Sequence, residues 1–202
     1  SRAVAHVAEG CRAGDERMNE VLDFLRRRRS RPAKMLTGPG PGRAEIEDML
    51  AIAGRVPDHG KLEPWRFVVI EGAALERLAR AIRARAVETG ADADKGAGAF
   101  EGAPVAVAVI GVPRESEKIP AREQVLSAGC AAYNLLMAAL AAGWGANWLS
   151  GWPAYDAQLM QAELGLGGAE WVAGFIHIGR CEAVPPERPR PDMAAVTTWL
   201  DA

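Results

Sequence analysis

The first candidate for chemistry is a run of basic residues near the start of the chain. Residues 26–29 and 31 are all arginine, and Ser30 lies among them. Guanidinium groups bind phosphate through two parallel hydrogen bonds, and a neighbouring serine hydroxyl adds another. The run therefore indicates a phosphate clamp. Two other interpretations stay open: the solvated end of a helix, where positive side chains complement the dipole, and a nucleic-acid patch, which the lack of a basic stripe elsewhere disfavours.

A second candidate is the polar loop at residues 55–64, which contains Arg55, His59, Lys61 and two prolines. The loop leads directly into a predicted strand. Loops held between regular elements are where ligand-binding groups concentrate. Asp58 is only the chain neighbour of His59, and the other histidines stand in unrelated contexts. We therefore expect a ligand-binding loop here and no metal site.

The chain offers no self-contained catalytic machinery. Ser150 lacks the Gly-x-Ser-x-Gly context of a nucleophile elbow, and neither a cysteine–histidine pair nor a pair of carboxylates stands out. The glycine-rich stretch GPGPG is not followed by the Gly-Lys-Ser/Thr of a P-loop. A phosphate clamp without catalytic residues of its own is typical of proteins that use a cofactor for the reaction.

Hydrophobic periodicity predicts the elements that must position these groups. Helices are predicted from Asn19 to the basic run and for residues 44–54, 73–88 and 157–164, and strands for residues 65–70, 105–112, 146–149 and 171–178. Asp156 has the residue type of an N-cap for the last helix. Residues 90–102 are interpreted as a mobile lid or a short helix. The order of elements predicts an α+β fold of mixed α/β layers.

The chain is organised around residues 127–152, an apolar helix followed by a glycine break and an aromatic-rich strand. A helix that is apolar on nearly every side belongs in a core or in a membrane. The stretch is about long enough to span a bilayer, but its alanines, its glycine break and Asn134 favour a core helix or a dimer contact. Cys130 in this helix is interpreted as a small buried hydrophobe.

Composition and charge indicate an ordinary soluble globular protein. Of the 202 residues, 49% are hydrophobic and 25% charged, and the formal net charge of -2 draws the protein to neither nucleic acid nor lipid. Three scattered cysteines suggest neither zinc nor disulfides, which fits the cytoplasm. We interpret residues 1–17 as an extension without a signal peptide and residues 18–202 as a single domain. The proline-rich tail ends in strand-like residues 196–200 and suits an arm around a partner subunit.

Together these motifs resemble the FMN-dependent nitroreductase family, most closely its short, minimal-length bacterial branch. The resemblance runs from about Val21 to Leu200 and rests on the order and spacing of several motifs. These motifs are Arg28, Arg29 and Ser30 after the first helix; Arg55, Val56, Pro57, Asp58 and His59 before Glu63, Pro64, Trp65, Arg66 and Phe67; Ser127, Ala128, Gly129 and Cys130 opening the long helix; the strand at residues 174–179; and Pro191 and Asp192 in the tail.

The resemblance implies a central, mostly antiparallel sheet flanked by helices, with a C-terminal arm that adds a strand to the partner subunit. It further implies a homodimer with two FMN sites at the subunit interface, each built from both chains. By position, Arg28, Arg29 and Ser30 match residues at the FMN phosphate and ribityl chain. Arg55 and His59 match flavin contacts that reach across from the partner, and Trp148, Leu149 and Ser150 match the segment along the isoalloxazine ring. The start of the turn expected at residues 138–143 matches a region implicated in nicotinamide binding.

Three positions depart from the family pattern. Lys61 stands where relatives commonly have an amide or a small polar residue, and Glu63 stands where they have glutamine. A cation such as Lys61 near N1 of the flavin would raise its reduction potential. Leu149 replaces a basic residue, which leaves only its backbone to contact the flavin. We expect these changes to affect acceptor preference more than FMN binding.

The implied function is that of an oxidoreductase. NADH or NADPH gives a hydride to flavin N5 and leaves, and a nitroaromatic, quinone or similar acceptor then takes the electrons in a ping-pong cycle. The alternative is a non-catalytic flavin- or nucleotide-binding module with the same fold. We expect neither nucleic acid nor a membrane as a partner.

Overall fold

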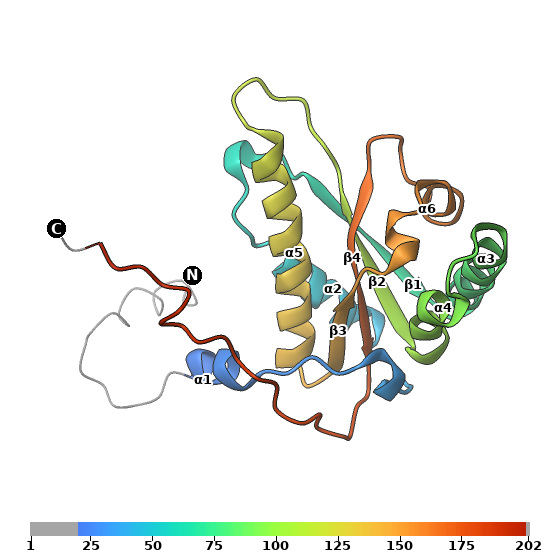
Figure 1. Ribbon diagram of the computed structural model, residues 1–202, viewed down its shortest axis with the longest axis horizontal. Helices are drawn as coiled ribbons and strands as arrows, with labels where there is room; N and C mark the ends of the chain where they lie inside the picture. The colour runs from blue at the N-terminus through green and yellow to red at the C-terminus, as the bar shows by residue number, and fades with distance from the viewer. Residues whose placement is uncertain (1–19, 201–202) are drawn as a thin grey trace.

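The fold is built on a four-stranded antiparallel sheet with helices on both faces (Figure 1). The computed structural model describes residues 20–200, so the predicted extension at residues 1–17 and the predicted start of the first helix at Asn19 lie outside the described residues. The strands are β1 (Trp65–Glu71), β2 (Val105–Gly111), β3 (Gly145–Leu149) and β4 (Trp171–Gly179). Their order across the sheet is β1-β2-β4-β3, with every neighbouring pair antiparallel. The predicted α+β class and mostly antiparallel sheet are confirmed.

Strand β2 forms the centre of the sheet. Each of its residues is buried, as its uninterrupted apolar sequence predicts for a strand covered on both faces. Strand β3 forms one edge, and within residues 20–200 its strand partner is β4, with Gly145 opposite Gly179 and Leu149 opposite Phe175. The backbone groups on the other side of β3 are therefore available for hydrogen bonds with another segment.

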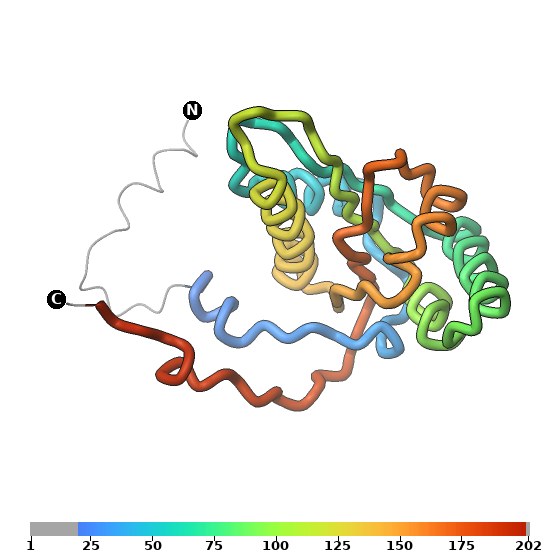
Figure 2. Tube along the Cα trace, turned by 45° about the horizontal axis from the view of Figure 1, so that its top comes forward, coloured from blue at the N-terminus to red at the C-terminus, as the bar shows by residue number. Residues whose placement is uncertain are grey.

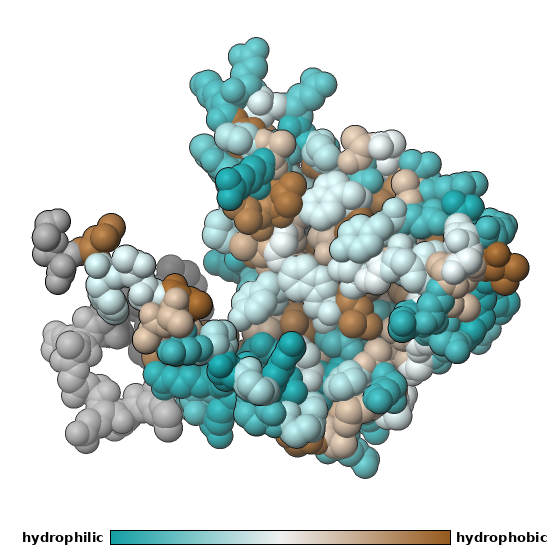
Figure 3. All heavy atoms as spheres, viewed as in Figure 1, coloured by the Kyte–Doolittle hydropathy of each residue, from teal (hydrophilic) through white to brown (hydrophobic). Residues whose placement is uncertain are grey.

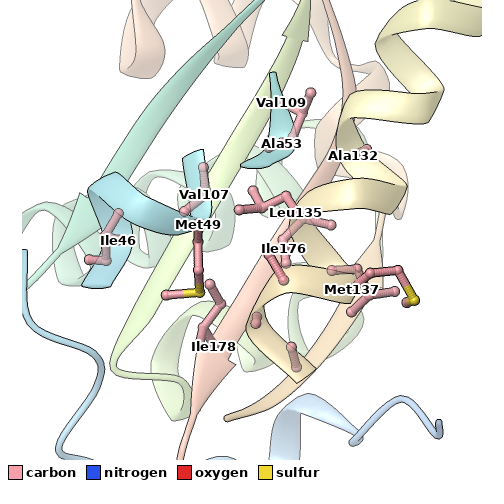
Figure 4. Packing of buried hydrophobic residues seen from close by; sticks show 14 of the residues in the cluster. Ile46, Met49, Ala53, Val107, Val109, Ala132, Leu135, Met137, Ile176 and Ile178 are labelled. Atoms are coloured by element: carbon pink, nitrogen blue, oxygen red, sulfur yellow. The ribbon is translucent and has the colours of Figure 1, made fainter. Parts of the chain in front are cut away.

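Helices α2 (Arg43–Ala53) and α5 (Ala121–Ala141) cover one face of the sheet. Figure 4 shows Met49 of α2, Leu135 of α5 and Ile176 of β4 pointing toward one another in the core. The other face packs against α3 (Ala73–Thr89), α4 (Ala93–Gly102) and α6 (Ala157–Leu164) through a second apolar cluster. The molecule thus has three layers, with the sheet in the middle.

Helix α4 decides between the two interpretations of residues 90–102. Asp92 caps the helix by accepting a hydrogen bond from the backbone N–H of Lys95 at 3.0 Å. Ala97 and Phe100 are buried against the sheet. The segment is therefore a short packed helix and not a mobile lid.

Helix α5 begins at Ala121, before the apolar run that marks it in the sequence. By length and composition it could cross a membrane, yet 56% of its most apolar window is buried inside the protein. Its inner side packs on α2 and the sheet, which makes it the core helix. Its outer side carries Leu126, Cys130 and Tyr133, all exposed, and Figure 3 shows hydrophobic atoms on the surface over α5. The interpretation of Cys130 as a buried residue is wrong for the single chain, because Cys130 lies on this outer side.

The two ends of the described chain run side by side (Figure 2). Helix α1 (Glu20–Arg27) contains no buried residue and leads into an extended segment and the 3₁₀ helix η1 (Ala33–Met35). An isolated bridge joins Thr37 to Arg180, after which the C-terminal tail leaves the core. The tail forms no strand in the described chain, and Val196, Trp199 and Leu200 are 67%, 86% and 93% exposed.

Candidate functional site

The edge strand β3 positions the arginine segment that follows α1. The backbone N–H of Arg31 donates to the carbonyl of Ala146 at 2.8 Å, and the Asn147 side-chain amide donates to the carbonyl of Arg31 at 2.7 Å. Asn147 is buried, so these two bonds hold the segment from inside the protein. Arg26 and Arg27 therefore stand in the last turn of α1, whereas Arg29 to Arg31 follow on backbone that is anchored to β3.

A cleft of about 460 Å³ opens beside this segment. Its lining combines cations with apolar and small residues: Arg27, Arg28, Arg29, Arg31, Phe24, Leu140, Gly143, Trp144, Gly145 and Cys181, with Glu20 and Asp23 at one side. Asp23 forms an ion pair with Arg27. The cleft is thus rich in guanidinium groups, and this composition suits an anionic ligand.

Arg28 and Ser30 form the inner part of the clamp. Arg28 Nη2 donates to Ser30 Oγ at 3.1 Å, so the guanidinium and the hydroxyl lie side by side. Arg28 Nε is buried and has no hydrogen-bond partner in the described chain. A buried donor without a partner is costly. This orphaned donor fits a site completed by a ligand oxygen, as the phosphate of FMN would provide.

Arg29 differs from Arg28 because its guanidinium forms hydrogen bonds with the C-terminal tail. Its Nε and Nη2 donate to the carbonyl of Pro186 at 3.3 and 2.9 Å. Arg29 still lines the cleft. In the single chain it therefore ties the tail to the cleft wall.

Trp148, Leu149 and Ser150 lie on the same edge as the arginine segment. Leu149 follows Ala146 by three strand residues, about 10 Å along β3. Trp148 Nε1 donates to the carbonyl of Ala173 at 3.2 Å, and its ring lies over Gly174, where a Cβ would overlap it. Leu149 is 40% exposed and Ser150 is half-buried. The structure brings this predicted group and the arginine segment together along one strand.

Arg55, His59 and Lys61 lie in a loop near the opposite end of the sheet. The 3₁₀ helix η2 (His59–Lys61) precedes β1, and His59 Nδ1 lies 2.6 Å from Glu123 Oε2 in the first turn of α5. The backbone of Lys61 has a φ of 57°, in the left-handed region that non-glycine residues rarely adopt. Asp58 supports this turn because its carboxylate accepts hydrogen bonds from the backbone N–H groups of Leu62 at 3.2 Å and Glu63 at 2.8 Å.

The length of α5 separates the loop from the arginine cleft. Glu123 contacts the loop at one end of the helix, and Leu140 lines the cleft at the other. The helical rise between them is about 25 Å. Within one chain, His59 therefore does not meet the arginine cleft, whereas Arg55 lies beside the middle of α5, where its carbonyl accepts a hydrogen bond from the Asn134 side chain at 3.4 Å.

Two polar residues beside the predicted site had no role in the sequence interpretation. Asn147 and Glu123 anchor the arginine segment and the loop, respectively. The amide of Asn147 inside an apolar strand is a signal that could have been followed. Glu123 contacts a residue 64 positions away, and no local pattern marks such a contact. Within residues 20–200, no group of three or more His, Cys, Asp or Glu residues is arranged to hold a metal ion.

Known proteins of similar sequence share most of the chain. An Escherichia coli protein named "Putative NAD(P)H nitroreductase YdjA" is 34% identical over 163 residues, which are 79% of this chain and 87% of that protein. A Haemophilus influenzae protein named "Putative NAD(P)H nitroreductase" is 40% identical over 136 residues, 65% of this chain and 73% of that protein.

Solved structures share the fold at lower sequence identity. A nitroreductase-like family protein from Bacillus cereus superposes with a TM-score of 0.75 at 20% identity and covers 94% of this chain and all of its own. An FMN-dependent nitroreductase from Clostridium difficile reaches a TM-score of 0.62 at 21% identity, covering 86% of this chain and 93% of that one. The family model described as "Nitroreductase family" matches residues 25–180. This chain therefore belongs to the Nitroreductase family and is an oxidoreductase.

Proposed function

We propose that the protein is an FMN-dependent NAD(P)H oxidoreductase of the nitroreductase type. The observation that carries the proposal is the arginine cleft, whose lining residue Arg28 has a buried Nε without a partner and a hydrogen bond from Nη2 to the hydroxyl of the neighbouring Ser30. The names of the sequence relatives support the nicotinamide donor, and the FMN-dependent structural neighbour supports the flavin.

The cleft residues would hold the phosphate of FMN. Arg28 and Ser30 supply convergent donors, and Arg31 reinforces the segment because its Nη1 donates to the carbonyl of Arg29 at 3.1 Å. Each hydrogen bond between an arginine and a phosphate is worth roughly 1.5–3 kcal/mol, so several together retain a cofactor without a covalent link. Farther along β3, Trp148, the backbone of Leu149 and Ser150 would line the ring.

Bound FMN would supply the redox chemistry, taking a hydride from NADH or NADPH and passing electrons to a nitroaromatic, quinone or similar acceptor in a ping-pong cycle. The residues of the chain position the reactants and set the local charge. Lys61 is exposed at its turn and would place a cation at the flavin. Cytoplasmic localisation belongs to the same proposal, since the cysteines suggest no disulfide framework.

The separation of His59 from the arginine cleft supports a homodimer with shared sites. An antiparallel pairing of α5 with α5 of a second copy would bring the loop of one chain to the arginine cleft of the other. An apolar groove of about 880 Å³ between α1, α2 and α5 offers a contact surface, and Phe24, Met49, Ile52, Tyr133 and Met137 are among its lining residues. Apolar side chains that line an open surface groove are candidates for a contact with another chain.

The tail would complete the dimer. Residues 196–200 are strand-like in sequence and exposed in the single chain, which suits a strand added to the sheet of a partner. Arg29 holds the base of this tail through Pro186. The tail and the cleft are thus linked at the place where a second copy would bind.

The clamp is tested by replacing Arg28 and Ser30 together with alanine and measuring visible absorbance after purification. We expect wild-type protein to carry FMN equimolar with the chain and the double variant to be folded but nearly colourless. Arg80→Ala is the matched control, because Arg80 is an exposed arginine of α3 that pairs only weakly with Glu76, at 3.7 Å. Undiminished flavin in the double variant would refute the phosphate assignment. FMN without NAD(P)H turnover would favour the non-catalytic binding module.

A further inference from the structure

The first two turns of α5 hold the loops above them at three neighbouring points. Glu123 Oε2 lies 2.6 Å from His59 Nδ1. Ser127 is buried and its Oγ donates to the carbonyl of Pro57 at 2.7 Å. The N-terminal end of α5 therefore contacts the loop that carries Arg55, His59 and Lys61 through direct side-chain hydrogen bonds.

Gln124 forms hydrogen bonds with a second loop, residues 112–120, which lies beside the first. Its buried side chain accepts a hydrogen bond from the backbone N–H of Arg114 and donates one to the carbonyl of Arg114, both at 2.8 Å. Farther along this loop, Ile119 packs against Gly60, where a Cβ would overlap its Cδ1. Gly60 has a φ of 72°, so this turn requires glycine for its backbone as well as for space. The two loops consequently form one layer anchored on α5.

Within this layer, the contact between His59 and Glu123 contributes little to folding stability. The two side chains are 60% and 45% exposed, and exposed ion pairs are typically worth less than about 1 kcal/mol. The contact nevertheless restricts the imidazole, because a carboxylate at Nδ1 accepts a hydrogen bond from that nitrogen and directs Nε2 away from α5. Its main effect is on the orientation of the ring.

We propose that Glu123 is a positioning residue that orients His59 toward the FMN bound by the arginine cleft of a second copy. This inference rests on the proposed function, because it assigns Glu123 to the shared flavin site. Glu123 acts through His59 and does not itself touch the flavin. FMN binding would then depend on a carboxylate that contacts His59 and not the flavin.

The first experiment measures the FMN dissociation constants of Glu123→Ala, Glu123→Gln, His59→Ala and the double alanine variant by flavin fluorescence. We expect Glu123→Ala to weaken binding about tenfold, the size of one lost charge-assisted hydrogen bond. Glu123→Gln should recover most of this loss, because its amide oxygen can still accept from Nδ1. The double variant should bind no more weakly than His59→Ala, since Glu123 has no role once the imidazole is gone.

Glu47→Ala is the matched control. Glu47 pairs with Arg43 at 2.8 Å in another exposed ion pair, on α2, and it lines neither the arginine cleft nor the loop layer. Thermal unfolding of every variant checks that the fold is kept. Additive losses in the double variant, or unchanged affinity in Glu123→Ala, would overturn the positioning role.

The second experiment mixes two defective chains. A heterodimer of Arg28→Ala with Glu123→Ala should contain one site of wild-type FMN affinity, because both defects fall in the same shared site and leave the other intact. A heterodimer without a wild-type site would overturn the assignment of Glu123 to the partner's flavin. Wild-type protein that binds no FMN would instead refute the proposed function, and the inference would fall with it.

Discussion

His177 lies inside β4 with 1% of its surface exposed. Its ring packs against Phe100 and Phe175 at centroid distances of 4.8 and 6.4 Å, and neither ring nitrogen has a hydrogen-bond partner in the described chain. Burial lowers the pKa of His177 to about 4. The imidazole is therefore neutral in the folded protein and acts as a packing group at neutral pH.

This burial predicts a loss of stability in mild acid. Below the unfolded pKa of about 6.5 the unfolded chain binds a proton that the folded chain excludes. The folded protein therefore has its full free energy of unfolding, as far as His177 is concerned, above that pH. As the pH falls toward 4, this free energy decreases by up to about 1.4 kcal/mol per pH unit. Urea unfolding between pH 7 and pH 4 should show this slope in wild-type protein and a shallower one in His177→Leu. Identical slopes would contradict the prediction.

Gly174 predicts a second effect at the scale of one residue. A Cβ at this position would overlap the indole of Trp148, which packs against β4 at Gly174. Gly174→Ala should lower the free energy of unfolding by about 1–3 kcal/mol through overpacking, and it should shift Trp148 on the edge strand. Urea unfolding followed by tryptophan fluorescence measures both effects. Gly168→Ala, which would meet no neighbouring atom, is the control.

Among the elements, α6 depends on Asp156 at its first turn. Asp156 Oδ1 accepts a hydrogen bond from the backbone N–H of Leu159 at 3.0 Å, and Oδ2 accepts one from Arg85 of α3 at 2.7 Å. The hydrogen bond with Arg85 is the main cause of the lowered pKa of Asp156. One carboxylate thus caps one helix and joins it to another.

Replacement of Asp156 should separate these two roles. Asp156→Ala should cost about 1–2 kcal/mol of folding stability through the lost cap, and Asp156→Asn should cost less because its amide oxygen can still cap the helix. The stabilisation from the lowered pKa is present above the unfolded pKa and is lost as the pH falls through the folded pKa. Thermal unfolding at neutral and acidic pH compares the variants. Equal losses for alanine and asparagine would argue against the cap.

The sequence predicts most elements because their signals are local. The apolar run of β2, the cap at Asp156 and the glycines after α6 each depend on near neighbours. The early start of α5 was missed because Arg122 and Glu123 interrupt its apolar pattern, although Pro120 precedes the helix as a start signal. The arginine segment was found from residue type alone. Its attachment to β3 and the contact between His59 and Glu123 join residues far apart in the chain. Such long-range contacts leave no local pattern in a single sequence.

At the scale of the whole molecule, the outer side of α5 should be a subunit contact. Leu126 is 60% exposed in the single chain, so Leu126→Arg should leave the monomer fold intact while it disrupts the dimer. Sedimentation velocity should show a monomer, and flavin should be lost with the dimer. Val87→Arg is the control, because Val87 is 84% exposed on α3, across the sheet, and its variant should stay dimeric and yellow. A monomer that retains flavin would contradict the shared site.

The shared flavin site proposed above, with His59 and the arginine cleft at opposite ends of α5, would have a consequence for the behaviour of the protein in the cell. A protein whose every site needs two chains responds to its own abundance, because at low concentration the working species grows with the square of the amount of chain made. Scarce chains would then be idle apoprotein, and a modest rise in synthesis would bring a disproportionate rise in activity. A chain with a damaged loop would also impair the healthy subunit it joins.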